Sequence, residues 1–231
     1  MKAVIAVKSI ARAKQRLSTV LSAAERARLM SLMVEDVLSA LVASDSVSGV
    51  VVVTSDSAVK KLATGFGAMV LAEASDTQGP GSTALNAAFA QGIQAVEDMG
   101  VSDVLLLPAD IPLVTPDAID AMRRCHQRPG ISLNPAASDG GTNALMLSPL
   151  RAIVTAFGHN SCRRHIELAE QAGSSPTLFQ HPAFALDIDT IADLRALAAL
   201  PVTCRTQEYL EKSGVVARIQ ETPVIPGRQT G

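Results

Sequence analysis

Short apolar runs that recur along the chain predict buried strands. Residues 3–7, 50–53 and 104–107 form such runs, and none of them alternates with polar residues. Uninterrupted apolar runs are typical of strands that are buried on both faces, as in a parallel sheet covered by helices. Residues 143–147 and 184–188 are two later candidate strands.

The segments between these runs have the periodicity and the capping residues of helices. Apolar residues between Met30 and Leu41 recur with a 3.6-residue period, which predicts a helix with one buried face. Ser and Thr side chains cap helix N-termini well. Candidate caps precede five predicted helices, at Ser22, Ser82, Thr115, Ser161 and Thr190.

The alternation of strands and helices predicts an α/β fold, a doubly wound domain over residues 1–200 with a mostly parallel sheet. Residues 139–143 read DGGTN and predict a turn between two late strands, so part of the sheet is expected to be antiparallel. Residues 201–231 are more polar and contain one weak helical pattern near residues 208–212. We interpret them as a C-terminal extension, an appendage or frayed tail that is partly helical or flexible.

Composition narrows the class of protein. The chain has 231 residues, 48% of them hydrophobic, and a formal net charge of −2, which provides no general basic surface for nucleic acid or an anionic membrane. Three widely spaced cysteines without a C-x-x-C pair exclude a disulfide framework and a structural zinc site of ordinary spacing. No apolar run approaches the ~20 residues of a membrane span, and no signal peptide is expected. These features predict a reduced, cytoplasmic protein.

Four cations in nine residues follow the first predicted strand: Lys8, Arg12, Lys14 and Arg16. Loops at the carboxyl ends of strands are where open α/β sheets bind ligands. Cations clustered there indicate a phosphate-rich ligand. The alternative is an ordinary solvated basic loop, since Lys and Arg are mostly exposed.

Three aspartates follow predicted strands. Asp110 comes after the run at 104–107, and Asp187 and Asp189 flank Ile188 at the end of the run at 184–188. Residues i and i+2 of an extended chain share a face roughly 7 Å apart, so this pair can hold a hard cation. Mg²⁺ prefers oxygen ligands and often combines one or two carboxylates with substrate phosphates. Solvated Asp pairs are common at strand ends, but the third aspartate and the cationic loop match the parts needed around a nucleoside triphosphate.

Several well-known motifs are missing from the sequence. No G-x-G-x-x-G follows the first strand, and neither a P-loop nor a G-x-S-x-G is present, which argues against dinucleotide-binding, P-loop and serine-hydrolase functions. Residues 79–82 form a predicted tight turn into a helix, and free N–H groups around Gly81 could meet a phosphate or a base carbonyl. An ordinary helix entry is the alternative for this turn.

Two later loops are candidate anion sites. Residues 140–143 combine two glycines with the Thr142 hydroxyl, and residues 158–161 lead from Gly158 through His159 to a helix N-terminus at Ser161. Helix N-termini favour a carboxylate or phosphate. Both loops could equally be plain turns. His126 and His181 are expected at the surface, whereas His165, one turn into its predicted helix, is expected to pack or to cap.

Several of these elements, taken together, resemble the 2-phospho-L-lactate guanylyltransferases. The elements are A-K-x-R-L at 13–17, L-N at 85–86, A-D-x-P-L at 109–113, G-G-T-N-A-L at 140–145 and D-I-D-T at 187–190. The resemblance covers residues 1–200 and extends to the wider nucleotidyltransferase group that includes the molybdenum-cofactor guanylyltransferases. It implies a Rossmann-like three-layer α/β/α nucleotidyltransferase fold.

The resemblance also implies an activity, which is the transfer of GMP from GTP to a small phosphorylated acid with release of diphosphate. The product feeds biosynthesis of the deazaflavin coenzyme F-420. GTP and the acid would be the partners and Mg²⁺ the cofactor. Implied catalytic residues are Lys14, Arg16 and Asp110. Lys8, Lys14, Arg16, Gly81 and Asn86 would bind the nucleotide, Thr142, Gly158, His159 and Ser161 the acid, and Asp110, Asp187 and Asp189 the metal.

Three questions stay open at this stage. Relatives differ among 2-phospho-L-lactate, phosphoenolpyruvate and 3-phospho-D-glycerate, and this sequence departs from the commoner pattern at residues 159–162. Our hypothesis is that His159 or Asn160 meets an extra hydroxyl, which favours 3-phospho-D-glycerate. Alternative functions are a nucleotidyltransferase for a molybdopterin or sugar phosphate and a non-catalytic GTP-binding regulator. The sequence also leaves open a homodimer.

Overall fold

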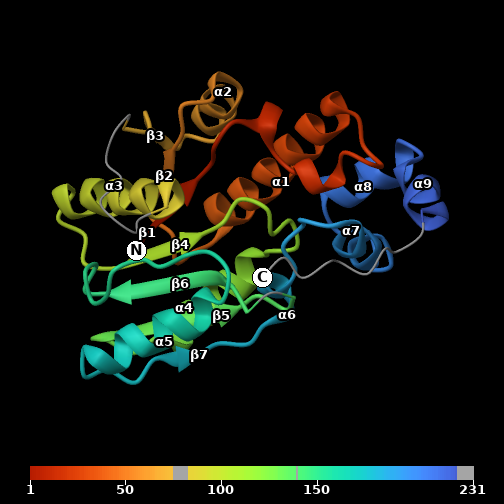
Figure 1. The fold of residues 1–231 in the computed structure, drawn as a ribbon. Helices are drawn as coiled ribbons and strands as arrows, with labels where there is room; N and C mark the ends of the chain where they lie inside the picture. Colours follow the sequence, from red (N-terminus) through yellow and green to blue (C-terminus); the bar gives the residue numbers. More distant parts are fainter. Residues whose placement is uncertain (75–82, 139, 223–231) are drawn as a thin grey trace.

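A seven-stranded mixed sheet forms the centre of the protein in the computed structural model, which describes residues 1–74, 83–138 and 140–222 (Figure 1). Its spatial order is β3-β2-β1-β4-β6-β5-β7. The strands are β1 (Lys2–Ala6), β2 (Val50–Val53), β3 (Met69–Leu71), β4 (Val104–Leu107), β5 (Gly130–Pro135), β6 (Thr142–Ser148) and β7 (Thr177–Leu178). β1 to β4 are parallel, while β6 runs antiparallel to both β4 and β5. The expected mostly parallel sheet with some antiparallel strands is confirmed.

Helices cover both faces of this sheet. The longer ones are α1 (Ala23–Ala43), α2 (Ser57–Gly65), α3 (Ala84–Asp98), α4 (Pro116–Cys125) and α5 (Ser161–Gln171). Neighbouring strand residues point to opposite faces, so Ile5 joins a core with α1 and α4, whereas Val4 packs with Phe89 of α3. Gly92 of α3 makes this packing close, because a Cβ there would lie 2.3 Å from Val4. The result is the three-layer α/β/α architecture.

The predicted helix caps are largely present. Ser22 forms a capping box with Glu25, and Thr115 and Thr190 cap their helices as expected. Thr83, not Ser82, caps α3 by accepting from the Asn86 N–H, and Ser82 lies outside the described residues. α5 begins one residue earlier than expected, at Ser161, with Asn160 as its cap in the left-handed region.

The strand expected at residues 184–188 is wrong. The chain forms a short helix instead, α6 (Pro182–Ala185), in which His181 caps the N-terminus and Pro182 occupies the first turn. Phe184 is fully buried, so the apolar run reflected burial and not strand geometry. Residues 186–189 then pass the end of β4, where the Ile188 N–H donates to the Asp110 carbonyl at 3.0 Å.

The C-terminal segment contains more structure than expected. It follows α7 (Ile191–Ala198) and folds into α8 (Arg205–Lys212) and α9 (Val215–Glu221), which lie beside α1 and α7 (Figure 1). The Asp36 carboxylate of α1 accepts from the Thr206 N–H at 2.9 Å and its hydroxyl at 2.6 Å. Leu210, Val215 and Ile219 are fully buried. Of the expected alternatives, the partly helical extension therefore applies to residues 205–221 and the frayed tail does not, and residues 223–231 lie outside the described part.

Candidate active site

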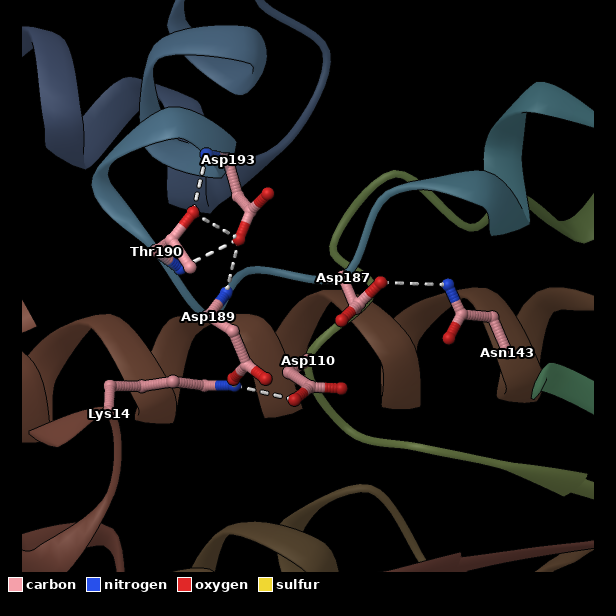
Figure 2. A network of polar contacts seen from close by, with 7 residues as sticks. All are labelled: Lys14, Asp110, Asn143, Asp187, Asp189, Thr190 and Asp193. Atoms are coloured by element: carbon pink, nitrogen blue, oxygen red, sulfur yellow. Dashed lines mark hydrogen bonds and ion pairs between the residues drawn. The ribbon is translucent and has the colours of Figure 1, made fainter. Parts of the chain in front are cut away.

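Lys14 and two aspartates meet at the carboxyl ends of β1 and β4 (Figure 2). The Lys14 ammonium donates to Asp110 Oδ2 at 2.5 Å and to Asp189 Oδ1 at 2.7 Å. Its side chain is only 6% exposed. Burial works to lower the pKa of Lys14, but attraction by Asp110 and Asp189 outweighs burial and raises the pKa above its ordinary value. Lys14 therefore carries a fixed positive charge between two carboxylates.

The local backbone turns Lys14 toward these carboxylates. Two 3-10 turns, η1 (Ile10–Arg12) and η2 (Gln15–Leu17), follow β1, and Lys14 lies between them with φ = 53°. This left-handed conformation is uncommon for a residue other than glycine. Asp56, at the end of β2, holds the first turn because its Oδ2 accepts from the Ile10 N–H at 2.9 Å. The loop is thus anchored on the neighbouring strand.

Asp187 lies close to Asp110 and is itself partly buried (Figure 2). Burial and the nearby Asp110 charge raise the pKa of the Asp187 carboxyl to about 6, although a hydrogen bond from Asn143 opposes the shift. Asn143 Nδ2 donates to Asp187 Oδ1 at 3.3 Å and to the Phe184 carbonyl at 2.8 Å. Asn143 of β6 therefore fixes both the side chain of Asp187 and the segment before it.

A capping box fixes the third aspartate, Asp189. Asp193 Oδ2 accepts from the Asp189 N–H at 3.0 Å, from the Thr190 N–H at 2.7 Å and from the Thr190 hydroxyl at 2.9 Å. The N-terminus of α7 and the backbone of Asp189 are consequently held by the same carboxylate (Figure 2).

A cavity of about 820 Å³ opens beside these residues. Lys8, Arg12 and Lys14 line it together with Asp110 and Asp189. Arg16 is exposed and is not among the lining residues, so Arg12 takes the position in the cavity that was expected for Arg16. The position of Arg12 in the cavity could not be predicted from the spacing of the cations in the sequence, because the turns η1 and η2 determine which cation faces the cavity.

Two acidic residues of this cavity were missed by the sequence analysis. Asp56 follows β2 and Glu73 follows β3, and both line the cavity. The signal that identified Asp110, an acidic residue just after a parallel strand, applies to both of them. Asp187, in contrast, is not among the residues that line this cavity.

Asn86 is buried and occupied by internal hydrogen bonds. Its Nδ2 donates to the Thr83 hydroxyl at 2.8 Å and to the Phe157 carbonyl at 3.1 Å, and its Oδ1 accepts from the Phe157 N–H at 2.8 Å. The side chain thus ties α3 to the loop before α5. It lines a second cavity, of about 770 Å³, and not the cavity beside Lys14. Gly81 lies outside the described residues.

The two candidate anion loops pack against each other. The Cys162 N–H donates to the Gly140 carbonyl at 3.0 Å, and the Ser161 hydroxyl donates to Thr142 Oγ1 at 3.2 Å. Gly140 has φ = 67°, a left-handed conformation that favours glycine, and a Cβ there would lie 2.9 Å from Asn160 Oδ1. The hydroxyls of Thr142 and Ser161 are both buried within the protein.

The histidines differ in environment. His165 is fully buried, and burial followed by the Arg164 charge lowers its pKa to about 4, so the ring is neutral near pH 7. The Ala156 N–H donates to His165 Nε2 at 2.9 Å, which places the ring proton on Nδ1 beside Thr142 Oγ1. The expectation that His165 packs is confirmed.

His126 is buried between Ser132 and Ser148, so its expected surface position is wrong. His159 is exposed, and with Gly158 it lines the second cavity.

The carboxylates allow a test of the metal expectation. Within the described ranges, no group of three His, Cys, Asp or Glu side chains is arranged to hold a metal ion by itself. The arrangement instead provides Asp110 and Asp189, with a cation between them, at the rim of an open cavity. Such a site suits an ion that takes one or two carboxylates and completes its shell with water and substrate phosphates, as Mg²⁺ does.

The comparison with protein families decides the class of the chain. It matches the family described as "Guanylyl transferase CofC like" over residues 1–228. The chain belongs to this guanylyltransferase family. The resemblance found from the sequence motifs is therefore confirmed, and the protein is a nucleotidyltransferase by family.

Relatives of this CofC-like chain have closely related names. A phosphoenolpyruvate guanylyltransferase of Conexibacter woesei is 34% identical over 201 residues, covering 86% of this chain and 87% of the relative. A 3-phospho-D-glycerate guanylyltransferase of Phenylobacterium zucineum is 35% identical over 212 residues, covering 90% and 94%. The relatives thus differ in the acid that their names give.

Solved structures support the fold of the CofC-like chain. A Desulfovibrio desulfuricans protein described as a nucleotide-diphospho-sugar transferase superposes with a TM-score of 0.73 at 18% identity, covering 96% of this chain and 98% of that protein. The expected nucleotidyltransferase fold is thereby confirmed. Among the residues that the structure describes, no helix has the length and apolar character to cross a membrane.

Proposed function

We propose that the protein transfers GMP from GTP to a small phosphorylated three-carbon acid and releases diphosphate. The observation that carries this proposal is the contact of Lys14 with Asp110 and Asp189 at the rim of a cavity lined by further cations. The chain's membership of a guanylyltransferase family supports the choice of reaction. The product would enter biosynthesis of coenzyme F-420, as the family implies.

The reaction requires two polyanions to approach each other. An oxygen of the acid's phosphate attacks the α-phosphorus of GTP, the bond from that phosphorus to the bridging oxygen of the β-phosphate breaks, and diphosphate leaves with the electron pair. The attacking oxygen is already ionised, so no strong general base is needed. Lys8, Arg12 and Lys14 would bind the triphosphate and stabilise its charge. Arg16, exposed on the second turn η2, would meet only the outer end of the nucleotide.

Asp110, Asp187 and Asp189 would hold Mg²⁺ together with the substrate phosphates. When bound, the ion would supply charge neutralisation and orientation for the phosphoryl groups. Asp187 supports this assignment because burial and the Asp110 charge disfavour its ionised form, a condition that a divalent cation relieves. The Lys14 ammonium occupies the space between Asp110 and Asp189, so it would move toward the triphosphate when the ion binds.

The acid would bind where the Gly140–Thr142 turn meets the N-terminus of α5. Because the hydroxyls of Thr142 and Ser161 are buried, backbone N–H groups near Gly158 and Ser161 would make the main contacts with its anionic groups. His159, which is exposed beside them, would contact the extra hydroxyl of 3-phospho-D-glycerate. Asn86 would act indirectly, by holding the Phe157 segment that precedes Gly158.

A diphosphate-release assay tests the proposal. GTP is combined with 2-phospho-L-lactate, phosphoenolpyruvate or 3-phospho-D-glycerate, and kcat/KM is compared among the three acids. Release with at least one acid supports the proposal, and a clear preference for an acid other than 3-phospho-D-glycerate contradicts the role of His159. Binding of GTP without release of diphosphate in the presence of any of the acids would favour the non-catalytic GTP-binding regulator. Release only with a molybdopterin or a sugar phosphate would favour the other nucleotidyltransferases.

A further inference from the structure

The cavity beside Lys14 has an acidic residue on its opposite side, Glu73. Glu73 lies two residues after the end of β3, is half-buried and lines the cavity together with Leu85. Within the described residues, its carboxylate has neither a hydrogen bond nor an ion pair. A carboxylate only accepts hydrogen bonds when ionised. It is therefore available to a ligand that presents N–H groups to this side of the cavity.

The backbone around Glu73 is held in place by one side chain of α3. Gln91 Nε2 donates to the Ala72 carbonyl at 2.7 Å, and Gln91 Oε1 accepts from the Ala74 N–H at 3.2 Å. The amide thus binds the residues before and after Glu73 and leaves the carboxylate itself free. Gln91 therefore fixes the backbone on both sides of Glu73, and the Glu73 carboxylate has no partner among the described residues.

Asp56 is the other acidic residue on this side of the cavity, and its carboxylate already accepts hydrogen bonds from the protein backbone. Its Oδ2 accepts from the Ile10 N–H at 2.9 Å, and its Oδ1 accepts from the Ala58 N–H at 2.9 Å and the Val59 N–H at 3.3 Å. It holds the first loop and caps α2. Glu73 is therefore the better candidate of the two for contact with a ligand.

The strand order places Glu73 away from the triphosphate end of the cavity. β3 and β4 are separated by β2 and β1, and three strand spacings of about 4.8 Å amount to roughly 14 Å. A nucleotide that lies across the ends of β1 and β2, with its phosphates beside Lys14 and Asp110, directs its base toward β3. A carboxylate at that end would repel phosphates, whereas it suits a base edge that donates hydrogen bonds.

We infer that Glu73 determines the base specificity of the enzyme by accepting hydrogen bonds from N1–H and the 2-amino group of guanine. This inference rests on the proposed function, because it assumes that the cavity binds a nucleoside triphosphate. Leu85 supplies an apolar contact for the base. Adenine has an unprotonated N1 and no 2-amino group, and xanthine has an oxygen at position 2, so each places an acceptor opposite the carboxylate and is rejected.

The test compares GTP, ITP and XTP in the wild type and the Glu73→Gln variant by diphosphate release with the preferred acid. The wild type is expected to prefer GTP to ITP and ITP to XTP. Loss of a charge-assisted hydrogen bond is expected to lower kcat/KM for GTP by about 10- to 100-fold in the variant. The glutamine amide can donate to the xanthine oxygen, so the ratio of XTP use to GTP use is expected to rise. An unchanged ratio would overturn the inference.

Glu170→Gln is the matched control, since Glu170 is exposed on α5 and lies outside the cavity. It is expected to keep the nucleotide preference of the wild type, and a change of that preference would also count against a specific role of Glu73. Thermal unfolding checks that Glu73→Gln is folded, as expected for a side chain without an internal partner. If the wild type releases diphosphate from GTP and the variant keeps its preference, only this inference fails. If the wild type releases none from any nucleotide, the proposed function fails.

Discussion

The Lys14 ammonium and the Asp110 carboxylate are 2.5 Å apart, although 96 positions separate them in the sequence. One residue follows β1 and the other follows β4, and these strands are parallel neighbours in the sheet. Parallel neighbours end at the same edge, so the contact follows directly from the strand order. Asp189 joins them from the segment before α7. The charged centre of the site is thus assembled by the topology of the sheet.

Replacement of Lys14 by Met tests whether the ammonium and a divalent ion compete for the same carboxylates. Without the ammonium, Asp110 and Asp189 should bind Mn²⁺ roughly 10-fold more tightly in the absence of nucleotide, because a nearby positive charge is gone. Electron paramagnetic resonance of Mn²⁺ measures this affinity. At the same time kcat/KM for GTP should fall. Lys60→Met, on the exposed face of α2, is the control, and an unchanged Mn²⁺ affinity of Lys14→Met would contradict the competition.

Asp110→Asn and Asp189→Asn are expected to lower kcat by about 100-fold or more while leaving the fold intact. Both side chains are partly exposed, at 23% and 46%, so loss of their charge weakens an ion pair without leaving a buried group unpaired. Steady-state kinetics and thermal unfolding measure the two effects. Asp45→Asn, at an exposed position, should behave as the wild type. Undiminished turnover in both site variants would refute the metal assignment.

Asp193→Ala is expected to lower the free energy of unfolding by about 1 kcal/mol, the typical contribution of a helix cap. The change removes the acceptor for the N–H groups of Asp189 and Thr190. Because the Asp189 backbone loses its anchor, kcat should also fall. Denaturant unfolding and kinetics test both effects. The matched control is Asp117→Ala, which changes an acidic residue in the first turn of α4, a helix that has no capping box. Equal effects of the two substitutions on kcat would contradict a positioning role of Asp193.

Two buried histidines should make the protein less stable in acid. Burial, followed by a nearby arginine charge, lowers the pKa of His126 and of His165 to about 4 from the ordinary value of 6.5. Between pH 6.5 and 4 the unfolded state therefore binds more protons than the folded state. The free energy of unfolding should fall as the pH decreases through this window, by up to about 1.4 kcal/mol per pH unit for each histidine.

Denaturant unfolding at several pH values measures this dependence. His126→Gln should reduce the slope, since one of the two depressed groups is gone. His159→Gln should leave it unchanged, because the His159 ring is exposed. The same slope in His126→Gln and the wild type would contradict the assignment.

The sequence was most informative where a single physical cause decides the structure. The valines of β2 and the leucines of β4 predicted buried parallel strands, because such runs need cover on both faces. The meeting of Lys14 with Asp110 could be expected because each residue follows a strand of this parallel part of the sheet, where strands end at the same edge. The run containing Phe184 was misleading, since burial alone does not distinguish a short helix from a strand.

Other features depend on contacts that no local pattern reveals. Arg12 and not Arg16 faces the cavity because of the φ of Lys14 and the two turns around it. The buried position of α8 depends on Asp36, which lies 170 positions before Thr206. The family resemblance predicted that Asn86 binds the nucleotide, but its side-chain amide is engaged in hydrogen bonds with Thr83 and Phe157. The first case is decided by local backbone geometry, and the other two involve partners far away in the sequence, Phe157 and Asp36.

The packing of the last two helices gives the end of the chain an influence on its chemistry. α7 starts immediately after Asp189, and Arg195 of α7 donates to the Ile219 carbonyl of α9 at 2.8 Å. The position of Asp189, an acidic residue of the candidate active site, therefore depends partly on residues near the C-terminus. Truncation of the C-terminal helices would therefore disable the enzyme, although it would remove none of the residues that line the cavity.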